Sequence, residues 1–147
     1  NKEFTVDVLV IGWGKACKTI AGRLAAEERK DALVERSAQM YGGQLHQHRV
    51  RATKDLIDSA SKRDGRDPAS YFTSAVADRD TLIATLNRTN HAMLEGKVLL
   101  LDGVASFTGP HTVKVVAGDD EITVRAETII VNTGSHPANL PVPGADG

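Results

Sequence analysis

A buried strand that runs straight into two closely spaced glycines constrains the fold of this chain more than any other feature. Residues 5–11 read TVDVLVI, a nearly continuous apolar run of the kind that forms strands buried on both faces. Gly12 and Gly14 follow at once, and residues 15–28 have the apolar spacing of a helix. Residues 32–34 then predict a second strand. This order predicts a βαβ unit whose two strands are parallel.

The two glycines occupy the first two positions of the pattern G-x-G-x-x-G, whose third position is Cys17. In that pattern the first glycine makes a tight turn, and the second lets the backbone approach a pyrophosphate at the helix N-terminus. A glycine or alanine is usual at the third position, so the larger Cys17 predicts a crowded contact between helix and strand. Glu35 ends the second strand about 20 residues after Gly14, where a carboxylate can accept the hydroxyls of an adenosine ribose. A glycine turn that merely closes an ordinary βα unit is the alternative.

Two further helices are predicted, at residues 45–61 and 78–94, with a polar surface connection at 62–70 between them. Asp78 and Asp80 are interpreted as cap and first-turn acids of the second helix. The rest of the chain alternates as strands do. Its predicted strands are 98–101, 105–108, 112–116, 122–125 and 128–131. We therefore expect an α/β domain of Rossmann-like, nucleotide-binding type: a parallel sheet with helices, plus a three-stranded antiparallel β excursion.

Charge, apolar runs and cysteine content bear on the partners, the location and the disulfides to be expected. A net charge of -1 gives no reason to expect nucleic acid or an anionic membrane. No apolar run approaches the roughly 20 residues that cross a bilayer, and the start of the chain has no signal-peptide pattern, so we expect a cytoplasmic protein. Cys17 is the single cysteine, so no disulfide can form within one chain.

Four blocks of the sequence resemble the N-terminal FAD domain of the pyridine nucleotide–disulfide oxidoreductases, the family of dihydrolipoamide dehydrogenase, glutathione reductase and mercuric reductase. The blocks are VLVIGWGKACKTIAGRLAA, ALVERSAQMYGG, ATKDLI and TIIVNTGSHPANLPVPG. The segments GWGKA and MYGG are most similar to the sequences of the reductases linked to mercury and to reactive-chlorine resistance.

The resemblance implies FAD as cofactor, with its pyrophosphate at the glycine turn and its adenosine ribose on Glu35. It further implies that Lys54 lies by the flavin N5 edge, that Gly103 and Val104 offer backbone contacts to the adenine, and that a Thr-Gly block closes over the cofactor. The cofactor-binding residues that it implies are Gly12, Gly14, Cys17, Glu35, Arg36, Gly42, Gly43, Lys54, Gly103, Val104, Thr133, Gly134 and Ser135.

The sequence also departs from the family pattern. The two redox cysteines fall on Leu45 and Val50, so no catalytic residue is expected, because dithiol–disulfide exchange needs a thiolate. Glu28 stands where a helix-ending glycine is usual, Asp31 where an apolar residue begins the strand, and Asn132 where the Thr-Gly block has an alanine.

The resemblance implies that residues 1–147 are the N-terminal part of an FAD-binding domain, without the NAD(P)H and dimerisation domains. Intact relatives pass electrons from NAD(P)H through FAD to a disulfide or another acceptor, and the full-length relative is expected to be a homodimer. We expect this chain alone to be inactive as an enzyme. A non-catalytic nucleotide-binding or interaction module on the same scaffold is the alternative. NAD(P) in place of FAD is disfavoured, because a simple NAD domain needs neither the double-glycine loop nor the Thr-Gly block.

Several other residues could be functional but also have plainer interpretations. His46 and His48 form an H-x-H pair, but no third ligand is evident, so no metal site is expected. Cys17 is interpreted as a small buried residue rather than a reactive thiol. The side chain of Trp13 can point either toward a cofactor or toward a following loop. The remaining residues of this kind are interpreted as core or loop packing: Phe4, Met40, Phe72, Met93 and Phe107.

Overall fold

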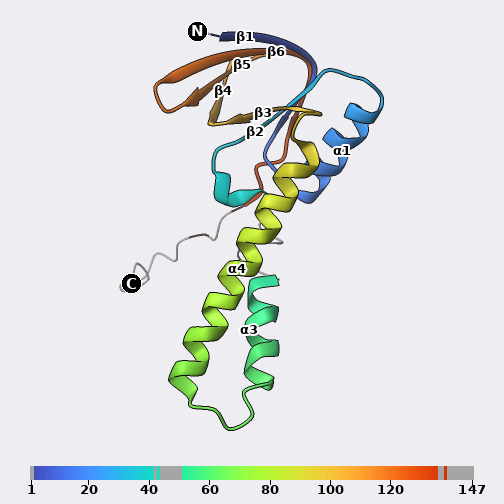
Figure 1. The fold of residues 1–147 in the computed structure, drawn as a ribbon. Helices are drawn as coiled ribbons and strands as arrows, with labels where there is room; N and C mark the ends of the chain where they lie inside the picture. The colour runs from blue at the N-terminus through green and yellow to red at the C-terminus, as the bar shows by residue number, and fades with distance from the viewer. Residues whose placement is uncertain (1, 42, 44–50, 136–137, 139–147) are drawn as a thin grey trace.

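The computed structural model describes residues 2–41, 43, 51–135 and 138 (Figure 1). Its elements in chain order are β1 (Lys2–Ile11), α1 (Lys15–Ala26), β2 (Asp31–Glu35), the 3-10 turn η1 (Ala38–Met40), α3 (Arg51–Ser61), α4 (Pro68–Leu94), β3 (Leu99–Asp102), β4 (Val104–Gly109), β5 (Thr112–Ala117) and β6 (Asp120–Val131). None of the helices in this part of the chain has the length and apolar character of a membrane span.

The strands form one sheet in the order β3-β2-β1-β6-β5-β4. Strands β3, β2, β1 and β6 run parallel, while β5 pairs antiparallel with the first half of β6 and with β4. The α/β class and the three-stranded antiparallel excursion are therefore confirmed. The two strands predicted at 122–125 and 128–131 are a single strand, because β6 pairs with β1 along its length and with β5 only over its first residues.

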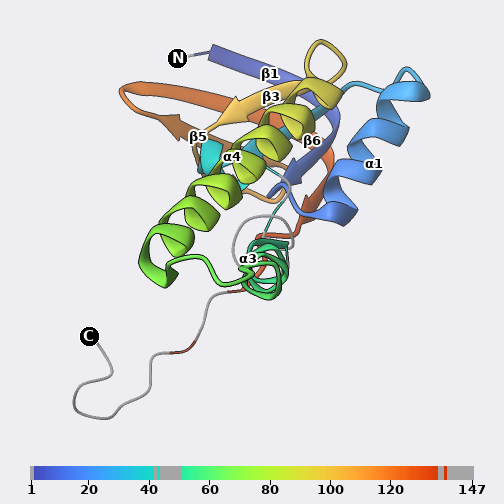
Figure 2. The ribbon, with the colours of Figure 1, turned by 60° about the horizontal axis from the view of Figure 1, so that its bottom comes forward.

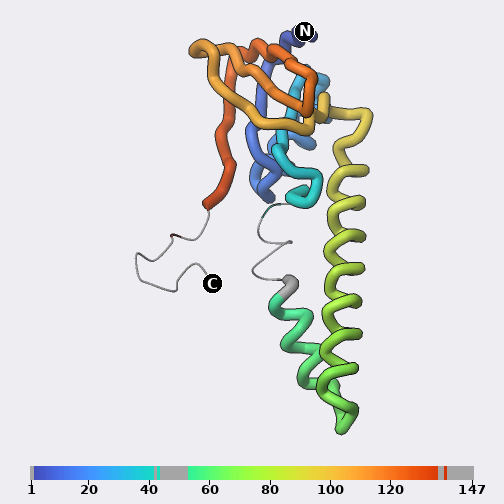
Figure 3. The backbone as a smooth tube through the Cα atoms, turned by 90° about the vertical axis from the view of Figure 1, so that its left-hand side faces the viewer, coloured from blue at the N-terminus to red at the C-terminus, as the bar shows by residue number. Residues whose placement is uncertain are grey.

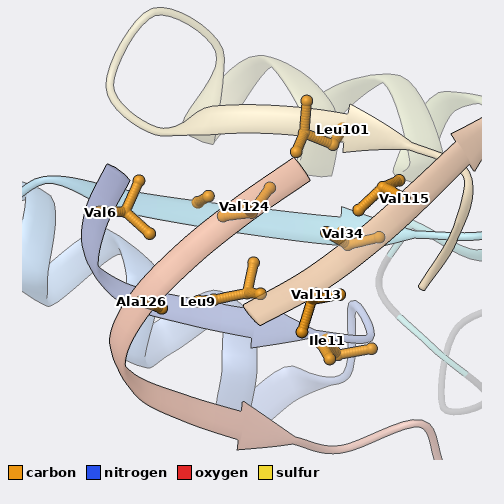
Figure 4. Packing of buried hydrophobic residues seen from close by; sticks show 10 residues of the cluster. Val6, Leu9, Ile11, Val34, Leu101, Val113, Val115, Val124 and Ala126 are labelled. Carbon is orange, nitrogen blue, oxygen red and sulfur yellow. The ribbon is translucent and has the colours of Figure 1, made fainter. Parts of the chain in front are cut away.

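Strand β1 is buried on both faces, which explains its continuous apolar run. Leu9 and Ile11 point into a cluster between the parallel strands and the antiparallel excursion (Figure 4). The intervening Val8 and Val10 point to the opposite face, where α1 and the end of α4 cover the sheet (Figure 2). The alternation follows from the period of two along a strand. Strands β1 and β2 thus have packed layers on both sides.

Helix α4 starts much earlier than the sequence predicts. Asp67 is its N-cap and accepts a hydrogen bond from the Ser70 N–H at 2.9 Å, and Pro68 occupies the first turn. Proline is favourable there because its missing N–H has no intrahelical partner anyway. The surface connection predicted at 62–70 therefore ends before Pro68, and the interpretation of Asp78 and Asp80 as cap and first-turn acids was wrong, since both lie inside the helix.

Helices α3 and α4 form a hairpin that extends away from the sheet (Figures 1 and 3). Tyr71 of α4 donates a hydrogen bond to the Ser59 carbonyl of α3 at 2.9 Å. Phe72 on this hairpin is exposed, as are Met93 near the end of α4 and Phe107 on β4. The interpretation of these three residues as packing residues was wrong. The start predicted for the first hairpin helix, residue 45, lies outside the described residues.

Candidate dinucleotide-binding site

The glycine turn lies where β1 and β6 end side by side. The Gly12 N–H donates to the Val34 carbonyl at 2.8 Å, and the Asn132 N–H donates to the Ile11 carbonyl at 2.9 Å. Gly12 has a φ of 104°, and a Cβ added there would lie 2.3 Å from the Asn132 carbonyl oxygen. Both the backbone conformation and the space therefore require glycine at this position.

Gly14 caps helix α1 without any side-chain hydrogen bond, and the first turn carries no acidic residue. The N–H groups at this helix end are therefore available to an anion. A Cβ on Gly14 would lie 3.0 Å from the Asn132 Nδ2 atom. Gly43 also approaches closely, because a Cβ on it would lie 3.1 Å from the Gly14 Cα. The fold thus brings three residues without side chains, Gly12, Gly14 and Gly43, close together beside the Asn132 side chain.

The Glu35 carboxylate lies at the bend of the glycine turn. Its Oε2 accepts the Trp13 N–H at 3.0 Å, and its Oε1 accepts the Ser37 N–H at 3.2 Å. The Glu35 carbonyl accepts the Gly103 N–H at 2.9 Å. Each carboxylate oxygen has a second lone pair. The half-buried carboxylate can therefore orient the turn and still accept hydroxyl groups of a ligand.

The Trp13 side chain points into the fold. It is 1% exposed, and its ring centroid lies 4.6 Å from that of Tyr41 and 6.0 Å from that of His91, with which it stacks at 15°. The sequence left two directions open for this side chain, toward a cofactor or toward a following loop. In the structure it points toward the following loop, which contains Tyr41. Tyr41 was not recognised as part of the site from the sequence, although the MYGG block contained it.

Tyr41 ties this loop to the end of β3. Its hydroxyl donates to the Asp102 carboxylate at 2.7 Å, and its carbonyl accepts from the Asn90 side chain at 3.2 Å. Burial and the neighbouring Asp102 raise the pKa of the Tyr41 phenol. Tyr41 and His91 also line a hollow of about 440 Å³ between η1 and α4. The glycine turn does not line this hollow.

Cys17 is fully buried on α1, facing the sheet. Burial raises the pKa of its thiol, and an interaction with the Asn132 side chain lowers it in part. The interpretation of Cys17 as a buried packing residue is confirmed. A thiol without solvent access whose pKa is raised is a poor nucleophile.

Of the other described residues implied by the resemblance, Gly103 is half-buried and the rest are exposed. Gly103 lies next to Glu35, and a Cβ on it would meet the Val116 carbonyl oxygen at 2.5 Å. Exposed positions hold Arg36, Lys54, Val104, Thr133, Gly134 and Ser135. Lys54 belongs to α3, whose packing partner in the described structure is α4.

Some positions named from the sequence cannot be placed in the fold. Gly42, Leu45, His46, His48 and Val50 lie outside the described residues. Within the described ranges, no three side chains of the metal-ligating types come together.

Comparison with known proteins places this geometry among flavoproteins. The family model described as pyridine nucleotide-disulphide oxidoreductase matches residues 6–147. The probable pyridine nucleotide-disulfide oxidoreductase RclA of Escherichia coli K12 is 30% identical over 92% of this chain and 30% of its own length. A soluble pyridine nucleotide transhydrogenase of Colwellia psychrerythraea is 26% identical over 93% of this chain and 32% of its own length.

Solved structures agree with these matches. The Cu(II) complex of the HOCl-induced flavoprotein disulfide reductase RclA from E. coli superimposes with a TM-score of 0.85 at 29% identity. The superposition covers 98% of this chain and 31% of the solved chain. The chain therefore spans about a third of the length of the relatives that it matches.

Proposed function

Because this chain belongs to the pyridine nucleotide-disulphide oxidoreductase family, we propose that it is the FAD-binding part of a flavoprotein oxidoreductase. One observation carries the proposal. The Glu35 carboxylate accepts the backbone N–H of Trp13, the residue between the two glycines of the turn. The acid expected to bind a ribose and the turn expected to bind a pyrophosphate are thereby held in one rigid unit.

The residues present fit a dinucleotide. Three glycines meet where any Cβ would crowd the backbone or a neighbouring side chain, and helix α1 offers uncapped N–H groups. A phosphate group favours such a helix end because the N–H groups and the helix dipole both attract an anion. In this proposal the turn amides bind the pyrophosphate, Glu35 accepts the ribose hydroxyls, and the backbone at Gly103 and Val104 lies along the adenine.

Bound FAD supplies electron transfer between a pyridine nucleotide and an acceptor. The chain's own part is to bind and orient the cofactor. Lys54, Arg36 and the exposed segment Thr133–Gly134–Ser135 are proposed as further contacts. Because Leu45 and Val50 occupy the cysteine positions of the family, a disulfide within this chain is not the proposed acceptor. Use of NAD(P)H, a homodimeric whole protein and a cytoplasmic location remain parts of the proposal.

Binding of FAD to purified protein tests the proposal. We expect FAD to bind, ADP to compete with it and FMN, which lacks the adenosine, to bind far more weakly. Glu35→Gln replaces one accepting oxygen by a donor and should weaken FAD binding by roughly tenfold or more, as expected for loss of hydrogen bonds to a charged group. Glu27→Gln, at the exposed end of α1, is the matched control, and thermal melting verifies that each variant is folded. Equal binding of FMN and FAD would contradict the proposed adenosine site.

A non-catalytic nucleotide-binding module is the second candidate, favoured by the missing cysteines. A folded protein that binds ADP but remains colourless with FAD would support this candidate. A yellow protein whose flavin is reduced by NAD(P)H when the remaining domains are present would favour the first.

A further inference from the structure

Two departures from the family pattern contact each other across the fold. Cys17 stands at the third glycine position of the turn motif, and Asn132 stands where the Thr-Gly block has an alanine. The residues are far apart in the sequence, but the Asn132 side chain interacts with the Cys17 thiol and lowers its pKa.

The Asn132 backbone is fixed where β6 ends. Its N–H donates to the Ile11 carbonyl at 2.9 Å, and its own carbonyl oxygen occupies the space beside Gly12 that a Cβ would need. Its Nδ2 atom lies over Gly14, 3.0 Å from the position of an added Cβ. The side-chain amide therefore lies at the N-terminus of α1, and the residue is solvent-exposed.

The side-chain amide has two N–H donors. One donor suffices for the Cys17 sulfur, which is a weak acceptor, and the second is left for another partner. Cys17 is fully buried on α1, and the amide that interacts with its thiol lies beside Gly14 at the first turn of the helix. The second donor then lies at the N-terminus of α1, where Gly14 provides no side-chain cap.

We propose that the Asn132 side-chain amide is an additional donor to the pyrophosphate of the bound dinucleotide, with Cys17 as its positioning residue. The inference rests on the proposed function, because it names one more contact in the same site. A donor to a charged phosphate oxygen forms a stronger hydrogen bond than a donor to a neutral acceptor. Asn132 would therefore compensate for the larger third residue of the turn motif by adding a contact from the opposite strand.

Equilibrium binding of FAD, ADP and adenosine to variants at these two positions tests the inference. Asn132→Ala restores the usual residue of the family, so the variant should fold. We expect it to bind FAD and ADP about tenfold more weakly, with adenosine binding unchanged. Asn132→Asp keeps the size but replaces the donors by a negative charge, so its loss should be larger. Cys17→Ala should weaken ADP binding by a smaller factor, and Cys17→Ser, which keeps a polar partner, should restore part of it.

Thr128→Ala, an exposed change on the same strand, is the matched control. If Asn132→Ala binds ADP as well as or better than the unaltered protein, the amide only fills space and the inference is wrong. A loss equal for adenosine and ADP would mean a general structural effect and would also overturn it. If the unaltered protein binds neither FAD nor ADP, the proposed function itself fails, and this outcome is distinct from the other two.

Discussion

At the residue scale, Asp31 departs from the family pattern and is expected to destabilise the folded protein. The residue begins β2 and is 4% exposed, and neither carboxylate oxygen accepts a hydrogen bond from another described residue. Burial raises its pKa to about 6. The sequence identified this position as one that normally holds an apolar residue, and the structure supplies the reason, since the side chain has no access to water.

Replacing this carboxyl should stabilise the protein. At neutral pH the buried carboxylate opposes folding, so Asp31→Leu is expected to raise the free energy of unfolding by about 1–3 kcal/mol in urea denaturation. The favourable contribution of the protonated form is fully present below pH 4 and is lost as the pH rises through about 6. The gain in Asp31→Leu should therefore grow between pH 4 and pH 6 and then level off.

Asp78→Leu, at an exposed position inside α4, is the control and should change stability by less than about 0.5 kcal/mol. A gain in Asp31→Leu that is the same at pH 4 and pH 7 would show that the carboxyl is not buried as described.

Other residue-scale contacts were beyond the reach of the sequence. The glycine positions and Glu35 could be named because a spacing of about 20 residues is built into the βαβ unit. The contact between Cys17 and Asn132 could not, because it depends on β6 lying next to β1, a pairing that no local pattern specifies. The packing of Trp13 on Tyr41 and His91 likewise joins three separate elements.

At the scale of the element, strands were easier to predict than helix ends. Buried strands such as β1 and β2 leave continuous apolar runs, and the turns between β4, β5 and β6 contain glycines. The start of α4 was missed because Pro68 can either break or begin a helix, and the choice depends on the cap at Asp67. The end of α1 was predicted more closely than the start of α4, because the family pattern has a helix-ending glycine at the position of Glu28.

The structure shows why glycine suits that position, and this gives a prediction. Glu28 has a φ of 58°, in the left-handed region where a Cβ is unfavourable by about 1 kcal/mol. Glu28→Gly should therefore raise the free energy of unfolding by up to about 1 kcal/mol, as measured by urea denaturation. Glu27 at the helix C-cap has a φ of -92°, so Glu27→Gly relieves no strain and should not stabilise the protein. Equal effects of the two substitutions would argue against strain at Glu28.

At the scale of the whole molecule, the candidate site lies where parallel strands present their carboxyl ends. Strand β1 ends directly before the glycine turn, β2 ends at Glu35, and β6 ends at Val131, directly before Asn132. In open α/β sheets ligands bind beyond the carboxyl ends of the strands. The location of the site could therefore be predicted once the parallel strands were recognised, whereas the projecting α3–α4 hairpin could not.

The residues proposed to bind the cofactor differ from the positions that hold the redox cysteines in the family. The single thiol, Cys17, is buried on α1, and the family's cysteine positions hold Leu45 and Val50. We therefore expect protein loaded with FAD and reduced by two electrons to show no long-wavelength absorbance band, because such a band needs a thiolate beside the flavin. The measurement is an anaerobic absorbance titration with dithionite.

The double substitution Leu45→Cys and Val50→Cys provides the positive counterpart, since it restores the family's thiols without altering the glycine turn. If the resemblance assigns these positions correctly, this variant gains the band while its affinity for FAD changes little. A band in the unaltered protein would mean that Cys17 reaches the flavin, in conflict with its full burial. Absence of the band in both proteins, with FAD bound, would show that residues 45 and 50 do not lie beside the flavin ring.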